Sequence, residues 1–246
     1  MGVGCAIITL NEAETLARTL ESVSFCDEIV VVDSGSTDDT IDIARRYTDK
    51  VYVKRWEGYG KQKNFAISRL STDWVLSVDA DEVVTSSLRD SIISAISRPA
   101  FDAYLINIQL VFLGKPLRFG GTYPDYHLRL FKKEVCRFDE SGVHERAVCH
   151  CKTGKLKGVM LHYSYRDLSD YLEKFNKYTT LIAKKHHEAE KRVSKLFPFL
   201  RISFELFKRI VLKGAFLDGY EGMLYATLSS FYTFVKYAKL IEMQER

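Results

Sequence analysis

Two aspartates, Asp79 and Asp81, close a short apolar run from Trp74 to Val78. In an extended chain, residues two positions apart point to the same side, so both carboxylates are expected to face one cleft. Two hard oxygen ligands on one face suit Mg²⁺ or Mn²⁺, which keeps its other positions for water and phosphate oxygens. The alternative is a solvated turn that begins with two aspartates. Because the pair ends an apolar run, we predict that Asp79 and Asp81 bind a divalent metal.

Polar side chains also follow the two apolar runs nearest the amino terminus. Asp33 ends the second run, where its carboxylate can accept hydrogen bonds from a nucleobase N–H or a ribose hydroxyl. Capping of the next helix is the alternative role, but Ser36 can supply that cap. Asn11 and Glu12 follow the first run, and Asn11 has the alternative role of a helix N-cap. We predict that these side chains bind a nucleotide.

A third group consists of Lys61, Lys63 and Asn64, which open a predicted helix after Gly58 and Gly60. The amino terminus of a helix, with cations nearby, can hold a diphosphate. The alternative is that the two lysines are solvated surface residues. We predict that this group contacts the diphosphate of the nucleotide.

Strands and helices that alternate along the first hundred residues would position these groups. The predicted strands cover residues 3–9, 29–32, 51–53 and 74–78, and a helical pattern follows each of them. Such alternation with short connections predicts parallel βαβ units. Ligands of these sheets bind beyond the carboxyl ends of the strands, where the acidic and amide residues lie. The predicted fold class is therefore α/β.

The second half of the chain has a different character. Residues 103–112, 126–131 and 159–163 are predicted strands, and the chain from residue 167 onward is predicted to be helical. Basic and aromatic residues crowd these helices, and the longest uncharged stretch, 222–235, is shorter than the roughly 20 apolar residues of a spanning helix. Such helices suit a membrane interface. A helical lid packed on the core or on a second subunit is the alternative.

Composition limits the classes of partner and the compartment. The formal net charge of +4 on 246 residues is too small to indicate nucleic acid. Five cysteines with irregular spacing argue against a disulfide framework and favour a reducing cytoplasm. The amino terminus lacks the basic segment of a signal peptide. Cys149-His150-Cys151 lacks the second ligand pair of a zinc site, so no zinc is expected there.

Three motifs together resemble family 2 glycosyltransferases of the GT-A fold. They are Ile7 to Glu12, Val31 to Asp38 and Asp79 to Glu82. The resemblance is closest to bacterial transferases of lipopolysaccharide core biosynthesis, and it extends through three later segments. These are Tyr123 to Phe131, Val143-His144-Glu145 and Leu161 to Ser164.

The resemblance implies a mixed central sheet with helices on both faces and a C-terminal helical extension. It also implies that Asn11, Glu12 and Asp33 hold the uracil and ribose of a UDP-sugar. Asp81, with Asp79 on the ribose or metal side, would bind the metal that bridges the diphosphate, and this positive charge would stabilise the leaving UDP.

An inverting transferase also needs a base that takes the proton of the acceptor hydroxyl. We predict Glu145 for this role, with Asp125 as the second candidate, because Asp125 lies on a Gly/Pro-rich loop. The sequence lacks the Glu-Asp pair that marks the base in many members of the family. Arg129 is expected either to contact a phosphate or brace the loop, or to form a buried ion pair.

The resulting prediction is a hexosyltransferase that acts with inversion on a saccharide acceptor, the lipopolysaccharide inner core. Residues 1–165 would form the catalytic domain, with a nucleotide-sugar half (1–98) and an acceptor half (99–165). Residues 166–246 would dock the enzyme at the inner face of the cytoplasmic membrane. Two alternatives are a sugar-phosphate nucleotidyltransferase, which should carry a Gly-rich loop after the first strand, and a non-catalytic membrane-associated scaffold.

Overall fold

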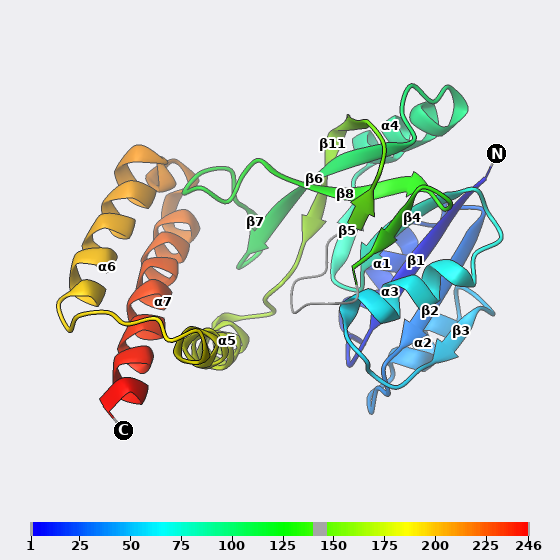
Figure 1. Ribbon diagram of the computed structural model, residues 1–246. Coiled ribbons are helices and arrows are strands. Elements are labelled where there is room, and N and C mark those ends of the chain that lie inside the picture. The colour runs from blue at the N-terminus through cyan, green and yellow to red at the C-terminus, as the bar shows by residue number, and fades with distance from the viewer. Residues whose placement is uncertain (1, 140–146, 246) are drawn as a thin grey trace. The chain divides into compact units, whose positions relative to one another are not determined.

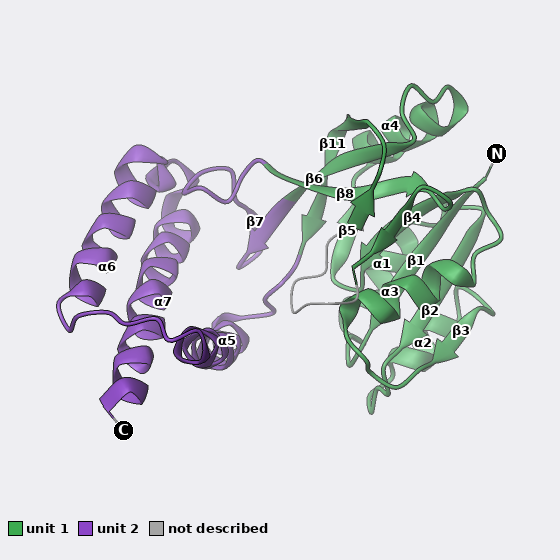
Figure 2. Cartoon of the chain, viewed as in Figure 1, with its two compact units in different colours: residues 1–108, 125–162 green, residues 109–124, 163–246 purple. Residues whose placement is uncertain are grey.

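The computed structural model describes residues 2–139 and 147–245 (Figure 1). The chain divides into two compact units (Figure 2). Unit 1 contains Met1–Ile108 and Asp125–His162, and unit 2 contains Gln109–Pro124 and Tyr163–Arg246. The segment 109–124 belongs to the same unit as the C-terminal helices.

Unit 1 begins with four parallel strands in the order β3-β2-β1-β4. They are β1 (Val3–Thr9), β2 (Glu28–Asp33), β3 (Val51–Val53) and β4 (Trp74–Asp79). β1 is buried along its whole length and lies between β2 and β4. The predicted parallel βαβ units are confirmed, and all four strands end at one edge of the sheet.

Helices cover both faces of this sheet, as predicted. They are α1 (Leu16–Ser22), α2 (Thr40–Arg45), α3 (Tyr59–Ser68) and α4 (Ser86–Ser97). Side chains of a strand alternate between its two faces, so Cys5 and Ile7 of β1 belong to one core, which includes buried residues of α1, α2 and α4. Ala6 and Ile8 belong to the other core, which includes buried residues of α3.

Beyond β4 the sheet continues in the order β8-β6-β11-β5, and β7 pairs with β6. These strands are β5 (Glu82–Val84), β6 (Ala103–Phe112), β7 (Lys115–Pro116), β8 (Asp125–Lys132) and β11 (Thr153–His162). β8 is antiparallel to both β4 and β6, and β5 is antiparallel to β11. The sheet is therefore mixed. The β5–β11 pairing places His162 opposite Glu82, next to the turn that follows β4.

A separate two-stranded ribbon is formed by β9 (Cys136–Phe138) and β10 (Ala147–Cys149). It contains a disulfide between Cys136 and Cys149, which are directly opposite each other in the antiparallel ladder. The sequence argued against a disulfide framework, and this pair corrects that expectation. An odd cysteine count does not reveal that strand pairing brings two of the five together.

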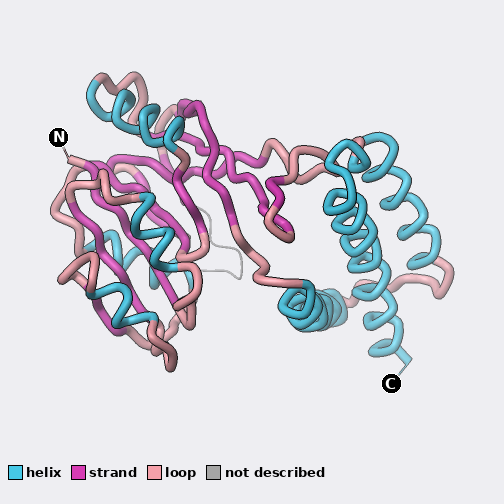
Figure 3. Tube along the Cα trace, turned by 180° about the vertical axis from the view of Figure 1, so that it is seen from behind, coloured by secondary structure: helices cyan, strands magenta, loops and turns pink. Residues whose placement is uncertain are grey.

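Unit 2 is mainly helical (Figure 3). It contains α5 (Leu168–Glu188), α6 (Phe197–Phe207), a π-helical turn η1 (Lys208–Leu212), a 3₁₀ turn η2 (Ala215–Asp218) and α7 (Gly219–Glu245). An aromatic core joins these helices to the segment 109–124: the ring of Phe112 lies 5.2 Å from that of Tyr225 and 5.7 Å from that of Tyr171. Within the described residues, no helix has both the length and the apolar character needed to cross a membrane.

Candidate functional site

The turn after β2 is organised by the buried carboxylate of Asp33. One of its oxygens accepts hydrogen bonds from the backbone N–H groups of Gly35 and Ser36, both at 2.8 Å. The other oxygen accepts a short hydrogen bond from the Ser36 hydroxyl. Both oxygens are engaged, so a contact with a nucleotide would add to these bonds rather than meet a free carboxylate. The next helix, α2, begins at Thr40 with Asp39 as its N-cap residue, so Ser36 does not cap it.

Asn11 and Glu12 are tied to the same turn. The backbone N–H of Asn11 donates to the Ser36 hydroxyl at 2.8 Å, and the Asn11 side-chain oxygen accepts from the N–H of Thr37 at 2.9 Å. The backbone N–H of Glu12 donates to the Thr40 hydroxyl at 2.8 Å. Asn11 has a φ of 55°, a left-handed conformation that asparagine tolerates better than most residues. Since Thr15 is the N-cap of α1, Asn11 does not have the alternative capping role.

Asp79 lies at the end of β4 between two cations. One carboxylate oxygen is 2.9 Å from Nζ of Lys63, and the other is 2.8 Å from the guanidinium of Arg129. Burial favours the neutral acid, but the charges of Arg129 and Lys63 outweigh it and hold the pKa of Asp79 well below its usual range. Asp79 is therefore a charged residue whose oxygens both have protein partners.

Glu82, at the start of β5, shares the guanidinium of Arg129 at 2.6 Å and accepts the backbone N–H of Asp79 at 2.8 Å. Burial raises the pKa of Glu82, and the neighbouring charge of Asp79 acts in the same direction. Arg129 thus forms the buried ion pair that was one of its two predicted roles. It joins the end of β4 to β5 and fixes the turn between them.

Asp81 lies in this turn and not in the extended strand. The argument that alternation along a strand aims Asp79 and Asp81 at one cleft therefore does not apply. Oδ2 of Asp81 is instead 3.1 Å from Nε2 of His162, at the end of β11. Although burial opposes the charged form, the hydrogen bond and charge of Asp81, together with Glu82 and Asp79, raise the pKa of His162 to about 9.

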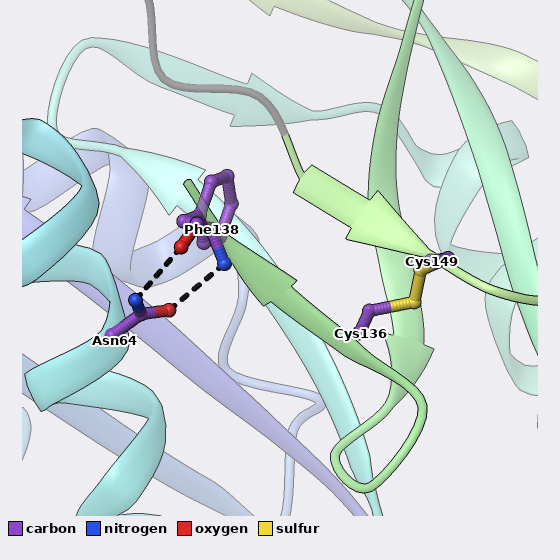
Figure 4. The surroundings of a disulfide bond; sticks show 4 residues. All are labelled: Asn64, Cys136, Phe138 and Cys149. Carbon is purple, nitrogen blue, oxygen red and sulfur yellow. Dashed lines mark hydrogen bonds between the residues drawn. A yellow bond between two sulfur atoms is a disulfide. The ribbon is translucent and has the colours of Figure 1, made fainter. Parts of the chain in front are cut away.

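The three residues that were predicted to hold a diphosphate occupy different surroundings. Lys63 is buried, with Nζ on Asp79 and 5.2 Å from the centre of the Phe138 ring. The side chain of Asn64 pairs with the backbone N–H and carbonyl of Phe138, both at 2.9 Å (Figure 4). Lys61 is exposed. Lys63 is thus no solvated surface residue, and of the three only Lys61 presents its side chain openly to solvent.

Of the two candidates for the base, Asp125 belongs to the described residues and Glu145 does not. Asp125 begins β8 with an exposed carboxylate 2.9 Å from Nε2 of His127, and its backbone N–H donates to the side chain of Asn107 at 2.8 Å. Glu145 lies outside the described residues, as do Val143 and His144.

Two residues of the site were not predicted, Glu82 as the partner of Arg129 and His162 as the partner of Asp81. Glu82 was quoted only as part of a motif, and His162 lies 81 positions from Asp81. Only the pairing of β5 with β11 brings His162 to this turn. The one available signal was that His162 belongs to the segment Leu161 to Ser164, which carried part of the resemblance.

Known glycosyltransferases resemble this chain over most of its length. The profile of glycosyl transferase family 2 matches residues 5–151. An uncharacterised glycosyltransferase of Rickettsia prowazekii is 32% identical, over 96% of this chain and 86% of the relative. The lipopolysaccharide core biosynthesis glycosyltransferase LpsC of Rhizobium meliloti is 31% identical, over 96% of this chain and 90% of the relative.

Solved structures share the fold at low sequence identity. Residues 1–349 of TarS from S. aureus superpose with a TM-score of 0.51 at 16% identity, over 100% of this chain and 92% of that one. A mannosyltransferase of Pyrobaculum calidifontis, solved with GDP-Man and Mn²⁺, gives a TM-score of 0.55 at 14% identity. The superposition covers 97% of this chain and 86% of the mannosyltransferase. The predicted GT-A fold is confirmed. The chain therefore belongs to glycosyl transferase family 2 and is a glycosyltransferase.

Proposed function

We propose that this enzyme transfers a hexose from a nucleotide-sugar, a UDP-sugar, to a lipid-linked saccharide acceptor, the inner core of lipopolysaccharide. The observation that carries the proposal is the grouping of Asn11, Asp33, Asp79 and Asp81 at the carboxyl ends of β1, β2 and β4. The likeness to TarS solved with UDP-GlcNAc supports a UDP-sugar (TM-score 0.50). The 31% identity to LpsC supports the acceptor.

In this proposal the nucleoside is bound by Asn11, Glu12 and Asp33. Hydrogen bonds hold the residues after β1 against the turn after β2, so that the two segments form one binding surface. Lys61 contacts the diphosphate from the amino terminus of α3. Asn64 is a positioning residue that holds α3 on β9, and Lys63 is a positioning residue for Asp79.

A divalent cation, Mg²⁺ or Mn²⁺, fits the pair of Asp81 and His162, and its binding would displace the proton that His162 retains without the ion because its pKa is raised. Neighbouring ligands of an octahedral ion with bonds of about 2.1 Å lie about 3 Å apart. The carboxylate oxygen and imidazole nitrogen are separated by 3.1 Å, and both residues are partly exposed. Asp79 has two cationic partners already, so in this proposal it positions the turn and the ribose side of the site rather than providing the main ligand. A bound ion would supply positive charge that stabilises the leaving nucleoside diphosphate.

Attack with inversion requires that a base accept the proton of the acceptor hydroxyl while the sugar carbon is attacked from the opposite face. Glu145 and Asp125 are the proposed candidates. Among the described residues, the exposed carboxylate of Asp125 lies 2.9 Å from Nε2 of His127, and its exposure allows an acceptor to reach it. An Asp125→Asn or Glu145→Gln variant that loses transfer but still binds UDP identifies the base.

The donor is tested by incubating the purified enzyme with UDP-hexoses and, in parallel, with GDP-mannose, in the presence of Mn²⁺ or of a chelator. We expect release of UDP from at least one UDP-hexose, and we expect the chelator to abolish it. Release of GDP alone would overturn the UDP assignment while leaving a nucleotide-sugar transferase. Release of neither, together with no binding of UDP, would overturn the proposed donor class.

We further propose that unit 2 binds the surface of the cytoplasmic membrane, where a lipid-linked acceptor is reached. Along α6, η1 and η2 a series of large apolar side chains is more than half exposed: Phe199, Leu200, Phe204, Phe207, Val211, Leu212, Phe216 and Leu217. The same stretch contains four basic residues, Arg201, Lys208, Arg209 and Lys213. Its two acids, Glu205 and Asp218, are both buried, and Glu205 pairs with Arg201. Apolar side chains with cations suit an anionic lipid surface.

Flotation with vesicles tests this part of the proposal. The enzyme is expected to float with vesicles that contain phosphatidylglycerol and less with pure phosphatidylcholine. A Leu200→Ser/Phe207→Ser variant should lose flotation, whereas Leu181→Ser, which changes a half-exposed leucine of α5, should not. Equal flotation of the double variant and the control would contradict membrane binding through this face.

A further inference from the structure

Three cysteines meet on the ribbon of β9 and β10, outside the donor site. Cys136 and Cys149 are directly opposite each other, with their Cα atoms 4.4 Å apart, and form the disulfide shown in Figure 4. Cys151 is a free thiol two residues after Cys149. The sulfur atoms of all three lie within 4.8 Å of one another. No zinc was expected at Cys149-His150-Cys151 because the sequence shows no second ligand pair, but the fold brings Cys136 to this site as a third sulfur.

The ribbon is fixed in place by its neighbours. Phe138, which ends β9, is held by both side-chain hydrogen bonds of Asn64 and lies against Nζ of Lys63. Cys136 is buried against the core on the α3 side of the sheet, while Cys149 and Cys151 are partly exposed. Cys136 therefore fixes the cluster to the core, and the partial exposure of Cys149 and Cys151 allows an ion to reach it from solvent.

A disulfide engages two of the three sulfurs, although the sulfur of Cys151 lies within 4.8 Å of both. Three thiolates around one point are instead the ligands that a thiophilic divalent cation prefers. With bonds of about 2.3 Å, two thiolates of a tetrahedral zinc site lie just under 4 Å apart, which is within the spacing of this cluster. His150, between Cys149 and Cys151, is exposed and is not part of the cluster.

We propose that the reduced chain binds one Zn²⁺ through the thiolates of Cys136, Cys149 and Cys151, with the fourth position left to water. The ion and the disulfide exclude each other, because Cys136 and Cys149 must be reduced before they can be ligands. A phosphine or dithiol reductant supplies two electrons to the disulfide, and each sulfur takes up one proton. Binding of Zn²⁺ then releases the thiol protons to solvent.

Bound zinc would connect the two strands of the ribbon to the segment after β10. The ribbon contacts Asn64 and Lys63 of α3. The ion would therefore stabilise the packing of the ribbon on α3, whose Lys63 positions Asp79. It is distinct from the divalent ion proposed at Asp81, and its ligands are sulfur rather than oxygen and nitrogen.

Cobalt titration tests the proposal, since Co²⁺ replaces Zn²⁺ and gives an intense charge-transfer absorption only when thiolates bind it. The full chain is reduced with a phosphine without free thiols, freed of the excess, and titrated with Co²⁺ and then with Zn²⁺. We expect the absorption to saturate at one Co²⁺ per chain and to vanish when Zn²⁺ displaces it. Cys151→Ser should weaken binding by at least about tenfold.

Two controls separate this site from others. Cys26→Ser removes a partly exposed cysteine outside the cluster and should leave the signal unchanged. Asp81→Ala should also leave it unchanged, so failure of the proposed donor site does not affect this result. Should Cys151→Ser not fold, Zn²⁺ must protect three cysteines of the wild-type chain from alkylation. Absence of the charge-transfer absorption, a Cys151→Ser variant with wild-type affinity, or protection of fewer than three cysteines would overturn the proposal.

Discussion

Arg129 is the residue on which the buried charges of the site depend. Its guanidinium contacts Asp79 at 2.8 Å and Glu82 at 2.6 Å, and Glu82 is fully buried. Lys63 gives Asp79 a second cation, which explains why the pKa of Asp79 falls while burial raises that of Glu82. These contacts join α3, β4, β5 and β8, so they set the position of the turn that carries Asp81.

Replacing Arg129 by Met should therefore destabilise the protein strongly. The buried carboxyl group of Glu82 and the partly buried one of Asp79 would lose a partner, and removal of one member of a buried ion pair costs about 3–5 kcal/mol. The matched control is Arg89→Met, because Arg89 is exposed and its ion-pair partner among the described residues is the exposed Asp90, a contact worth at most about 1 kcal/mol. The free energy of unfolding is measured by urea denaturation. Equal losses for the two variants would contradict the assigned role of Arg129.

At the scale of elements, the close approach of α4 to β11 depends on one glycine. Gly158 in β11 has a φ of +87°, and a Cβ there would come within 2.5 Å of the backbone nitrogen of Leu88 in α4. Backbone atoms cannot rotate aside as a flexible side chain can. The helix therefore packs on the sheet only because residue 158 has no side chain.

Gly158→Ala should lower the free energy of unfolding by more than Gly114→Ala. Gly114 has a similar φ of +82° but nothing within 4 Å of the added atom, so its substitution measures backbone strain alone, about 1–2 kcal/mol. The clash at Gly158 should add about 1–3 kcal/mol to that strain. Similar losses in the two variants would show that α4 moves freely to make room.

A second prediction at this scale concerns the start of α5. Asp170 accepts hydrogen bonds from Nζ of Lys174 at 3.0 Å and from the backbone N–H of Arg166 at 3.2 Å. Burial raises the pKa of Asp170, but these bonds and the charge of Lys174 outweigh it, so its pKa is lowered in the folded protein. The resulting stability is fully present above the unfolded pKa of about 3.9 and is lost as the pH falls through the folded value.

Asp170→Asn should accordingly reduce the free energy of unfolding at pH 7 more than at about pH 3. Urea denaturation followed by circular dichroism measures both values for the variant and the wild type. A difference between the two proteins that stays constant over this range would contradict the lowered pKa.

The elements that the sequence predicted are those with a local signal. The apolar runs of the parallel strands and β6 were predicted because hydrophobic pattern is visible within ten residues. β5, β9 and β10 were not predicted: each has only three residues, and none belongs to the regular strand–helix alternation from which the equally short β3 was predicted. β5 contains Glu82 and pairs with β11 at His162. Because β5 was not predicted, the contact of His162 with Asp81 was not predicted either.

At the scale of the whole molecule, the combination of three motifs was sufficient to predict the GT-A fold, and the family match confirms it. Membership of this family sets aside the nucleotidyltransferase and the non-catalytic scaffold that the sequence left open. Sequence spacing did not show that residues 109–124 pack with the C-terminal helices. In unit 2, Asp218 accepts the backbone N–H groups of Arg118 and Phe119 at 2.8 and 2.7 Å, contacts formed across about a hundred residues of sequence.

The central claim is that Asp81 and His162 hold a divalent ion for a UDP-sugar, and calorimetric titration of UDP with and without Mn²⁺ tests it most directly. We expect Mn²⁺ to strengthen binding in the wild type and in Asp90→Ala, an exposed control on α4. Asp81→Ala and His162→Ala should lose that gain, each by about 10–100-fold. Binding of UDP that is equally strong without Mn²⁺, or that keeps its dependence on Mn²⁺ in both variants, would contradict the account.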